Sequence, residues 1–294
     1  MKRFSLISTI SVLVLLMACK STTSEKQAIN FDSIDITSSG EPGNPLDSAG
    51  TGLPIFYNMY LSVELSSLFQ AAGAVFNADL MNSPEHISEY LTSSQQAINL
   101  GVYAVDLSYS RVFDQSETAG RYFSAMRQMS KELGIPADYF EKTSERFERN
   151  ISNKDSLIVI ANEVYVTTDN YLKENERYTT AAMIIMGGWI EAIHIAIDVA
   201  IESRNADIID KLVDQKYSLN NLMLMLAEHK KNEVVAEYLE DLLKIKKEFD
   251  TIEVPFDSSF DPNSPKGKEQ IEMVVQHIKA FAKVLNSFRD KLVK

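Results

Sequence analysis

Residues 179–203 of this 294-residue chain read TTAAMIIMGGWIEAIHIAIDVAIES. At about 100° per residue on a helical wheel, the polar groups and one glycine of this stretch fall within roughly a quarter turn. These residues are Thr180, Gly187, Glu191, His194, Asp198, Glu202 and the adjoining Asn205. Nearly every other position is apolar, which predicts a helix buried on most of its sides. We expect this helix to lie at the centre of a bundle.

The pair Gly187-Gly188 lies in the middle of this predicted helix. Each glycine costs roughly 1 kcal/mol relative to alanine in a helix interior. The pair therefore predicts that a neighbouring helix or a ligand approaches closely at this point.

The rest of the body also has helical periodicity, and no convincing strand pair is visible. Ser83-Pro84 is typical of a helix start, and the last predicted helix has an apolar stripe from Ile271 to Leu292. We expect helices over residues 84–113 with a break near Thr92, and over 117–133, 137–149, 152–173, 206–214, 219–229, 233–250 and 266–292. The predicted fold is all-α: an irregular bundle of about nine to ten helices around residues 179–203.

The segment before this body has a different composition. Residues 20–52 are rich in Ser, Thr, Gly, Pro and Asp, and Gly40-Glu41-Pro42-Gly43-Asn44-Pro45 disfavours helix and central strand. We expect residues 19–52 to be a disordered tether and residues 53–294 to be the helical domain. Whether residues 205–294 form a separate C-terminal lobe stays open at this stage.

The first residues are typical of a secretory signal. Lys2 and Arg3 precede an apolar stretch, residues 4–17, that is too short to span a bilayer comfortably. This stretch runs into Leu16-Met17-Ala18-Cys19, and Cys19 is the single cysteine of the chain. We expect residues 1–18 to be a signal peptide that is removed.

The segment Leu16-Met17-Ala18-Cys19 resembles the lipobox of bacterial lipoproteins, with leucine three residues before the cysteine and a small residue directly before it. The resemblance implies a covalent lipid on Cys19, and Lys20 in place of aspartate implies the outer membrane. Whether the body faces the periplasm or the cell surface is left open. In general plan the body resembles uncharacterised helical lipoproteins of Bacteroidota, and no characterised domain family is indicated.

Bulk composition excludes several classes of function. The formal charge is −12, which disfavours sequence-independent binding to nucleic acid. A body without cysteine has no disulfide and no thiol chemistry. After the signal, no apolar run is both long and uncharged, so we expect no membrane-spanning segment in the body.

Glu191-x-x-His194 resembles one half of the ligand set of di-iron carboxylate bundles. The other histidines, His86, His229 and His277, have no glutamate three residues before them, so the second half is missing. Three interpretations of the polar stripe remain: a water-facing edge of the helix, a cleft that binds a ligand without metal, or a metal site. We expect no metal and no cofactor other than the lipid.

A second candidate is Asp106, which lies in the apolar run from Leu100 to Leu107. A buried carboxylate needs polar partners. Side chains near it on the same helix face, or next to that face, are Tyr103, Tyr109, Ser110 and Arg111. Asp106 would then belong to a polar network that fixes helix register, or it would meet Glu191 and His194 across the bundle.

The leading hypothesis is a lipid-anchored, non-catalytic envelope protein that binds a partner protein or a small ligand. It attaches to the membrane through its lipid and does not bind nucleic acid. Candidate ligand-binding residues are Asp106, Glu191, His194 and Asp198, and no catalytic residue is assigned. The alternative is a metal-binding or enzymatic bundle that uses Glu191, His194 and Asp198 with Asp106.

Overall fold

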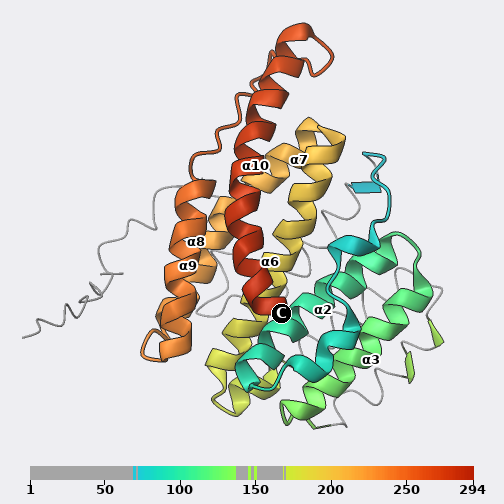
Figure 1. The fold of residues 1–294 in the computed structure, drawn as a ribbon, viewed down its shortest axis with the longest axis vertical. Helices are drawn as coiled ribbons and strands as arrows, with labels where there is room; N and C mark the ends of the chain where they lie inside the picture. The colour runs from blue at the N-terminus through green and yellow to red at the C-terminus, as the bar shows by residue number, and fades with distance from the viewer. Residues whose placement is uncertain (1–68, 71, 137–144, 147–148, 151–167, 169) are drawn as a thin grey trace, which may run out of the picture. The chain divides into compact units, whose positions relative to one another are not determined.

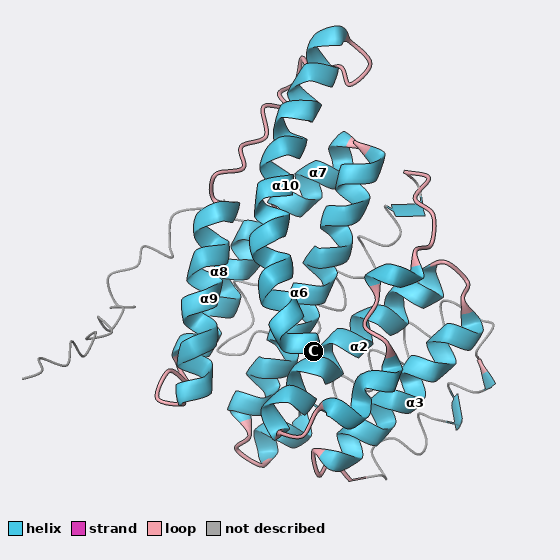
Figure 2. Ribbon diagram, viewed as in Figure 1, coloured by secondary structure: helices cyan, strands magenta, loops and turns pink. Residues whose placement is uncertain are grey.

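The computed structural model describes residues 69–70, 72–136, 145–146, 149–150, 168 and 170–294. Throughout these ranges the regular elements are helices and none is a strand, which confirms the all-helical prediction for this part of the chain (Figure 2). The predicted signal peptide, Cys19 and the tether lie outside the described residues, as do most of the helices predicted over 137–149 and 152–173.

The described elements occur in the following order (Figure 1). They are η3 (Ala78–Leu80), η4 (Pro84–Glu89), α2 (Ser93–Val112), α3 (Ser116–Glu132), α6 (Tyr178–Ser203), α7 (Ala206–Val213), α8 (Gln215–Ala227), α9 (Glu233–Phe249) and α10 (Pro265–Val293), where η denotes a 3₁₀ helix. The stretch predicted over 84–113 is divided near Thr92 into η4 and α2. Thr92 accepts a hydrogen bond from the backbone of Gln95, whose side chain accepts one in return. This reciprocal capping fixes the start of α2.

Helix α6 is buried without interruption from Ala181 to Ile193 and contacts α2, α7, α8 and α10. By length and composition alone it would suit a membrane span, with a mean hydropathy of 1.7 over its most apolar window. However, 83% of that window is buried inside the protein. Its apolar surface is therefore explained by packing against neighbouring helices.

Helices α2 and α6 pack most extensively, and they cross at two glycines. A Cβ atom on Gly101 of α2 would lie 2.0 Å from the Ile184 carbonyl oxygen, and one on Gly187 of α6 would lie 2.0 Å from the Ile98 carbonyl oxygen. Each helix thus presents a glycine to the backbone of the other. The close approach predicted from Gly187 is confirmed, and the neighbour is a helix.

Helix α10 carries the predicted apolar stripe and packs against α6 and α9. Ser264 caps its first turn by accepting from the backbone N–H of Gly267, and Pro265 is its first residue. Along the stripe the Phe281 ring stacks on Phe249 of α9 at a centroid distance of 4.3 Å. The last turn of α10 is buried at Leu292 and Val293.

Candidate functional site

A buried acid–arginine cluster lies where α2, α6 and α10 meet. Glu191 of α6 has a fully buried side chain, and the side chain of Arg289 on α10 is 11% exposed. Arg289 donates from Nε to Glu191 Oε2 and from Nη2 to Glu191 Oε1, both at 2.6 Å. This fork geometry uses both carboxylate oxygens and is the strongest form of an arginine–carboxylate pair.

Asp106 of α2 is the second acid of the cluster and is also fully buried. Its Oδ2 accepts from the backbone N–H of Asn82 at 3.1 Å, and its Oδ1 has no hydrogen-bond partner among the described residues. Burial raises the pKa of Asp106 well above its usual value, and the charge of Glu191 adds to this effect. The charge of Arg289 opposes the rise. The structure therefore brings Asp106 and Glu191 together around one arginine.

Polar side chains around this cluster hold the end of α10. Asn82 donates to Tyr90 Oη at 2.8 Å and to Asn99 Oδ1 at 3.1 Å. Tyr90 in turn donates to the Val293 carbonyl at 3.1 Å, and Asn99 donates to the Leu292 carbonyl at 2.8 Å. Carbonyls in the last turn of a helix lack partners within the helix, so these two side chains satisfy groups that burial would otherwise leave unpaired.

His194 and Asp198 lie farther along α6 and do not join the cluster. His194 is half-buried, and its Nδ1 lies 2.8 Å from Oδ1 of Asn286 on α10. Asp198 is also half-buried, and burial, reinforced by the charge of Glu202, raises its pKa. The water-facing interpretation of the stripe is wrong at Glu191, which is fully buried, and holds at Glu202, which is exposed.

The partners predicted for Asp106 from its own helix are wrong. Tyr103 donates to the Ser83 carbonyl, and Arg111 donates to the hydroxyl of Ser116. Tyr109 accepts from the backbone N–H of Asn77, and Ser110 donates to the backbone carbonyl of Asp106 rather than to its carboxyl group. The carboxyl group interacts with other segments instead: Oδ2 accepts from the backbone of Asn82, and the charges of Glu191 on α6 and Arg289 on α10 act on it.

Arg289 was missed from the sequence, although a signal was present. It follows Leu285 by four residues and precedes Leu292 by three, so it falls within the apolar stripe of α10. A charged residue at such a position is buried only when it is paired. The sequence analysis also missed three polar residues of the site, and no position within an apolar stripe marks them as buried. They are Asn82, Tyr90 and Asn99.

The cluster is poorly suited to hold a metal ion. Both oxygens of Glu191 are bound by Arg289, and the ring of His194 faces Asn286. Within the described ranges, no group of three or more His, Cys, Asp or Glu side chains is placed to hold a metal. A metal at Glu191 and His194 would have to displace the guanidinium group.

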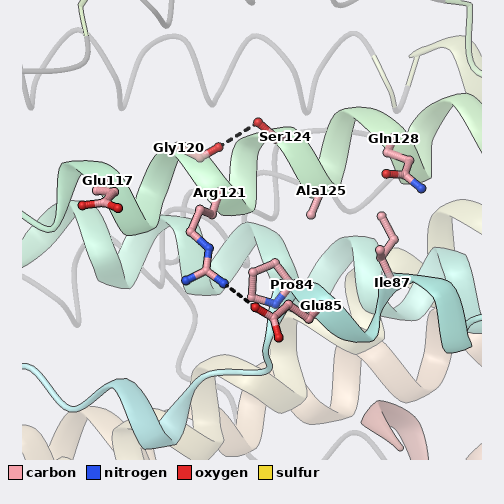
Figure 3. A pocket seen from close by; sticks show the side chains of 9 residues that line it. All are labelled: Pro84, Glu85, Ile87, Glu117, Gly120, Arg121, Ser124, Ala125 and Gln128. Atoms are coloured by element: carbon pink, nitrogen blue, oxygen red, sulfur yellow. Dashed lines mark hydrogen bonds and ion pairs between the residues drawn. The ribbon is translucent and has the colours of Figure 1, made fainter.

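A separate hollow of about 520 Å³ lies between η4 and α3 (Figure 3). Arg121 of α3 pairs with Glu85 of η4 across it at 3.1 Å, and the two side chains are 55% and 79% exposed. The other lining residues are Pro84, Ile87, Glu117, Gly120, Ser124, Ala125 and Gln128. None of the four residues predicted from the sequence lines this hollow.

Comparison of the chain with protein-family models, with curated proteins and with solved structures gives no match. Three features of the described residues bear on function: a buried acid–arginine cluster, a half-buried histidine and aspartate farther along α6, and an open hollow with a different lining.

Proposed function

We propose that this chain is a lipid-anchored, non-catalytic helical protein of the bacterial outer membrane that binds a partner protein or a small ligand. One observation supports the proposal that the protein is non-catalytic. Asp106 and Glu191, the two predicted site residues that meet, are fully buried, and their cluster also includes Arg289. A carboxyl group acts as a general acid or base only within hydrogen-bond reach of a substrate. In this arrangement the acids support helix packing.

The anchor follows from the lipobox resemblance of Leu16-Met17-Ala18-Cys19. More than one acyl chain is needed for stable anchoring, because each buried methylene contributes only about 0.8 kcal/mol. Acylation of both the thiol and the new amine at Cys19 would meet this requirement. Lys20 directly after it favours the outer membrane as the destination.

For binding, we favour the exposed end of the α6 stripe over the cluster itself. His194 and Asp198 are half-buried, so a ligand could reach them, whereas Asp106 and Glu191 lie beneath the surface. In this proposal Arg289 and its two acids hold α6 and α10 in place, and His194 and Asp198 supply polar contacts.

We also propose that the helices form a bundle of nine to ten members with α6 at its centre, as predicted from the sequence. Its support is that α6 contacts α2, α7, α8 and α10 and is buried over most of its length.

Replacement of the lipidated residue tests the anchor. We expect Cys19→Ala to abolish incorporation of labelled fatty acid and to move the protein from the membrane to the soluble fraction. Ser21→Ala is the matched control and should behave as wild type in both assays. Equal membrane partition of Cys19→Ala and wild type would overturn the anchor, and fractionation of inner from outer membranes tests the destination.

Elemental analysis tests the non-catalytic interpretation against its alternative. The full chain, purified in detergent without chelator, should contain no stoichiometric iron, manganese or zinc. A stoichiometric metal that disappears in His194→Ala would favour the metal-binding bundle of Glu191, His194, Asp198 and Asp106. His229→Ala serves as the control for a histidine outside the stripe.

A further inference from the structure

The junction of α2, α6 and α10 contains two acids and one base. Arg289 uses Nε and Nη2 on Glu191, and Nη2 also donates to the Leu80 carbonyl at 3.0 Å. Asp106 receives one backbone N–H and keeps Oδ1 without a partner among the described residues. If all three groups were ionised, a net negative charge would be buried at the junction, which is strongly unfavourable.

A neutral Asp106 removes this conflict. A protonated Oδ1 becomes a donor, and Glu191 is the acid that acts on Asp106 in this junction. The proton thus satisfies the orphan oxygen and leaves one carboxylate facing one guanidinium group. We propose that the folded protein holds this extra proton between Asp106 and Glu191, and that its loss at alkaline pH loosens the last turn of α10.

Arg289 is the cation whose charge acts on Asp106. On α6, His194 lies one turn after Glu191 with its Nδ1 2.8 Å from Oδ1 of Asn286, and Asp198 lies one turn farther along. Four tyrosines also surround the two acids, and burial raises the pKa of each, so they stay neutral. They are Tyr90 after η4, Tyr103 and Tyr109 of α2, and Tyr122 of α3. His86 reaches the cluster indirectly, since its Nδ1 lies 2.9 Å from Oδ1 of Asn82.

The sign of the pH effect follows from the direction of the shift. Burial first, and the charge of Glu191 second, raise the pKa of Asp106 in the folded state, against an unfolded value of about 3.9. The stabilisation from the neutral acid is therefore fully present below that unfolded value. It decreases as the pH rises through the folded pKa.

The end of α10 should respond first. Arg289 is the cation of the cluster and belongs to this end, three residues before Leu292. Tyr90 and Asn99 donate to backbone carbonyls of the same end. The side chain of Asn82 donates to both of them, and its backbone donates to Asp106. A new charge on Asp106 disturbs both groups of contacts at once.

Asp106→Asn tests the proposal, because asparagine has the shape and neutrality of the protonated acid. The measurements are Tm and amide hydrogen exchange in the last turn of α10 for the full chain, from about pH 5 to about pH 10. For wild type we expect Tm to fall as the pH rises. We also expect the protection factors of these amides, which correct for the base-catalysed exchange of an unfolded chain, to fall. For Asp106→Asn we expect both changes to be much smaller. Asp290→Asn, one residue from Arg289 and exposed, should retain the wild-type pH dependence.

One result would overturn the proposal: a Tm of Asp106→Asn that varies with pH as the wild-type Tm does, with or without a constant offset. If Asp106→Asn does not fold, carboxyl carbon-13 shifts of wild type replace it. An aspartate carboxyl that titrates well above the ordinary range supports the proposal, and ordinary titration of every aspartate contradicts it.

Glu191→Gln adds an independent check, because Asp106 should then ionise as the one remaining acid and titrate at lower pH.

Discussion

Two arginine–glutamate pairs of the same composition lie in different surroundings. Arg289 and Glu191 join α10 to α6 in the interior, with side chains 11% and 0% exposed and both contacts at 2.6 Å. Arg121 and Glu85 join α3 to η4 at an open hollow, with side chains 55% and 79% exposed and one contact at 3.1 Å. Their surroundings, and not their residue types, decide how much each pair affects stability.

Solvent explains the difference. Water screens an exposed pair and solvates either partner when the other is removed, so such pairs contribute about 0–1 kcal/mol. In the interior the remaining partner has no water, and removal of one charge costs about 3–5 kcal/mol. Removal of one partner should therefore destabilise the fold strongly at the buried pair and only slightly at the exposed pair.

Arg289→Met should have the largest effect, because it leaves Asp106 and Glu191 buried without a cation. We expect a loss of about 3–5 kcal/mol in the free energy of unfolding, measured by chemical denaturation. The loss should shrink as the pH is lowered, because protonation removes the negative charge that the variant leaves buried. A loss below about 1 kcal/mol at neutral pH would place this pair in the same class as the exposed one.

Gly187→Ala should have the second largest effect. The added Cβ would lie 2.0 Å from the Ile98 carbonyl, so the backbones of α2 and α6 must separate near the acid–arginine cluster. We expect a loss of about 2–3 kcal/mol by denaturation. Ser124→Ala on α3, an exposed position at the hollow, is the control and should change the free energy of unfolding by less than about 1 kcal/mol through helix propensity. A loss in Gly187→Ala no larger than the change in this control would argue against the close crossing.

Tyr90→Phe removes one of the side chains that hold the end of α10. The Val293 carbonyl loses its donor and Asn82 loses one acceptor, both in the interior. We expect a loss of about 1–2 kcal/mol and faster hydrogen exchange in the last turn of α10. Tyr238→Phe is the control at a half-buried tyrosine, one that packs against Phe288. Unchanged exchange in Tyr90→Phe would remove Tyr90 from the network.

Arg121→Ala should have the smallest effect. The pair with Glu85 is exposed, so we expect a loss below about 1 kcal/mol in the free energy of unfolding. Added salt should reduce this loss further, because exposed charges are screened. A loss comparable with that of Arg289→Met would contradict the distinction between the two pairs.

Local signals in the sequence predicted the helices well. Ser83-Pro84, the break near Thr92 and the apolar stripe of α10 each depend on residues within a few positions of one another. Their structural counterparts are the start of η4, the capped start of α2 and the packed face of α10. One start was misplaced, since α8 begins at Gln215 and not at Leu219.

The site was less predictable because it depends on contacts between distant segments. Asp106 was selected as a buried acid and Glu191 as part of a polar stripe, and the idea that they meet across the bundle was one of two left open for Asp106. Their shared partner Arg289 is 98 residues from Glu191, and no spacing within one helix indicates which helix faces which. The position of Arg289 within the α10 stripe could have identified it as buried, but not its partner.

A double-mutant cycle on each pair tests the central claim most directly, namely that burial makes Arg289 and Glu191 a structural unit. The variants are Arg289→Met and Glu191→Gln, singly and together, with Arg121→Ala and Glu85→Ala as the exposed pair. We predict a coupling free energy of about 1–3 kcal/mol for the buried pair and below about 0.5 kcal/mol for the exposed pair. Effects of Arg289→Met and Glu191→Gln that add within about 0.5 kcal/mol would contradict the account.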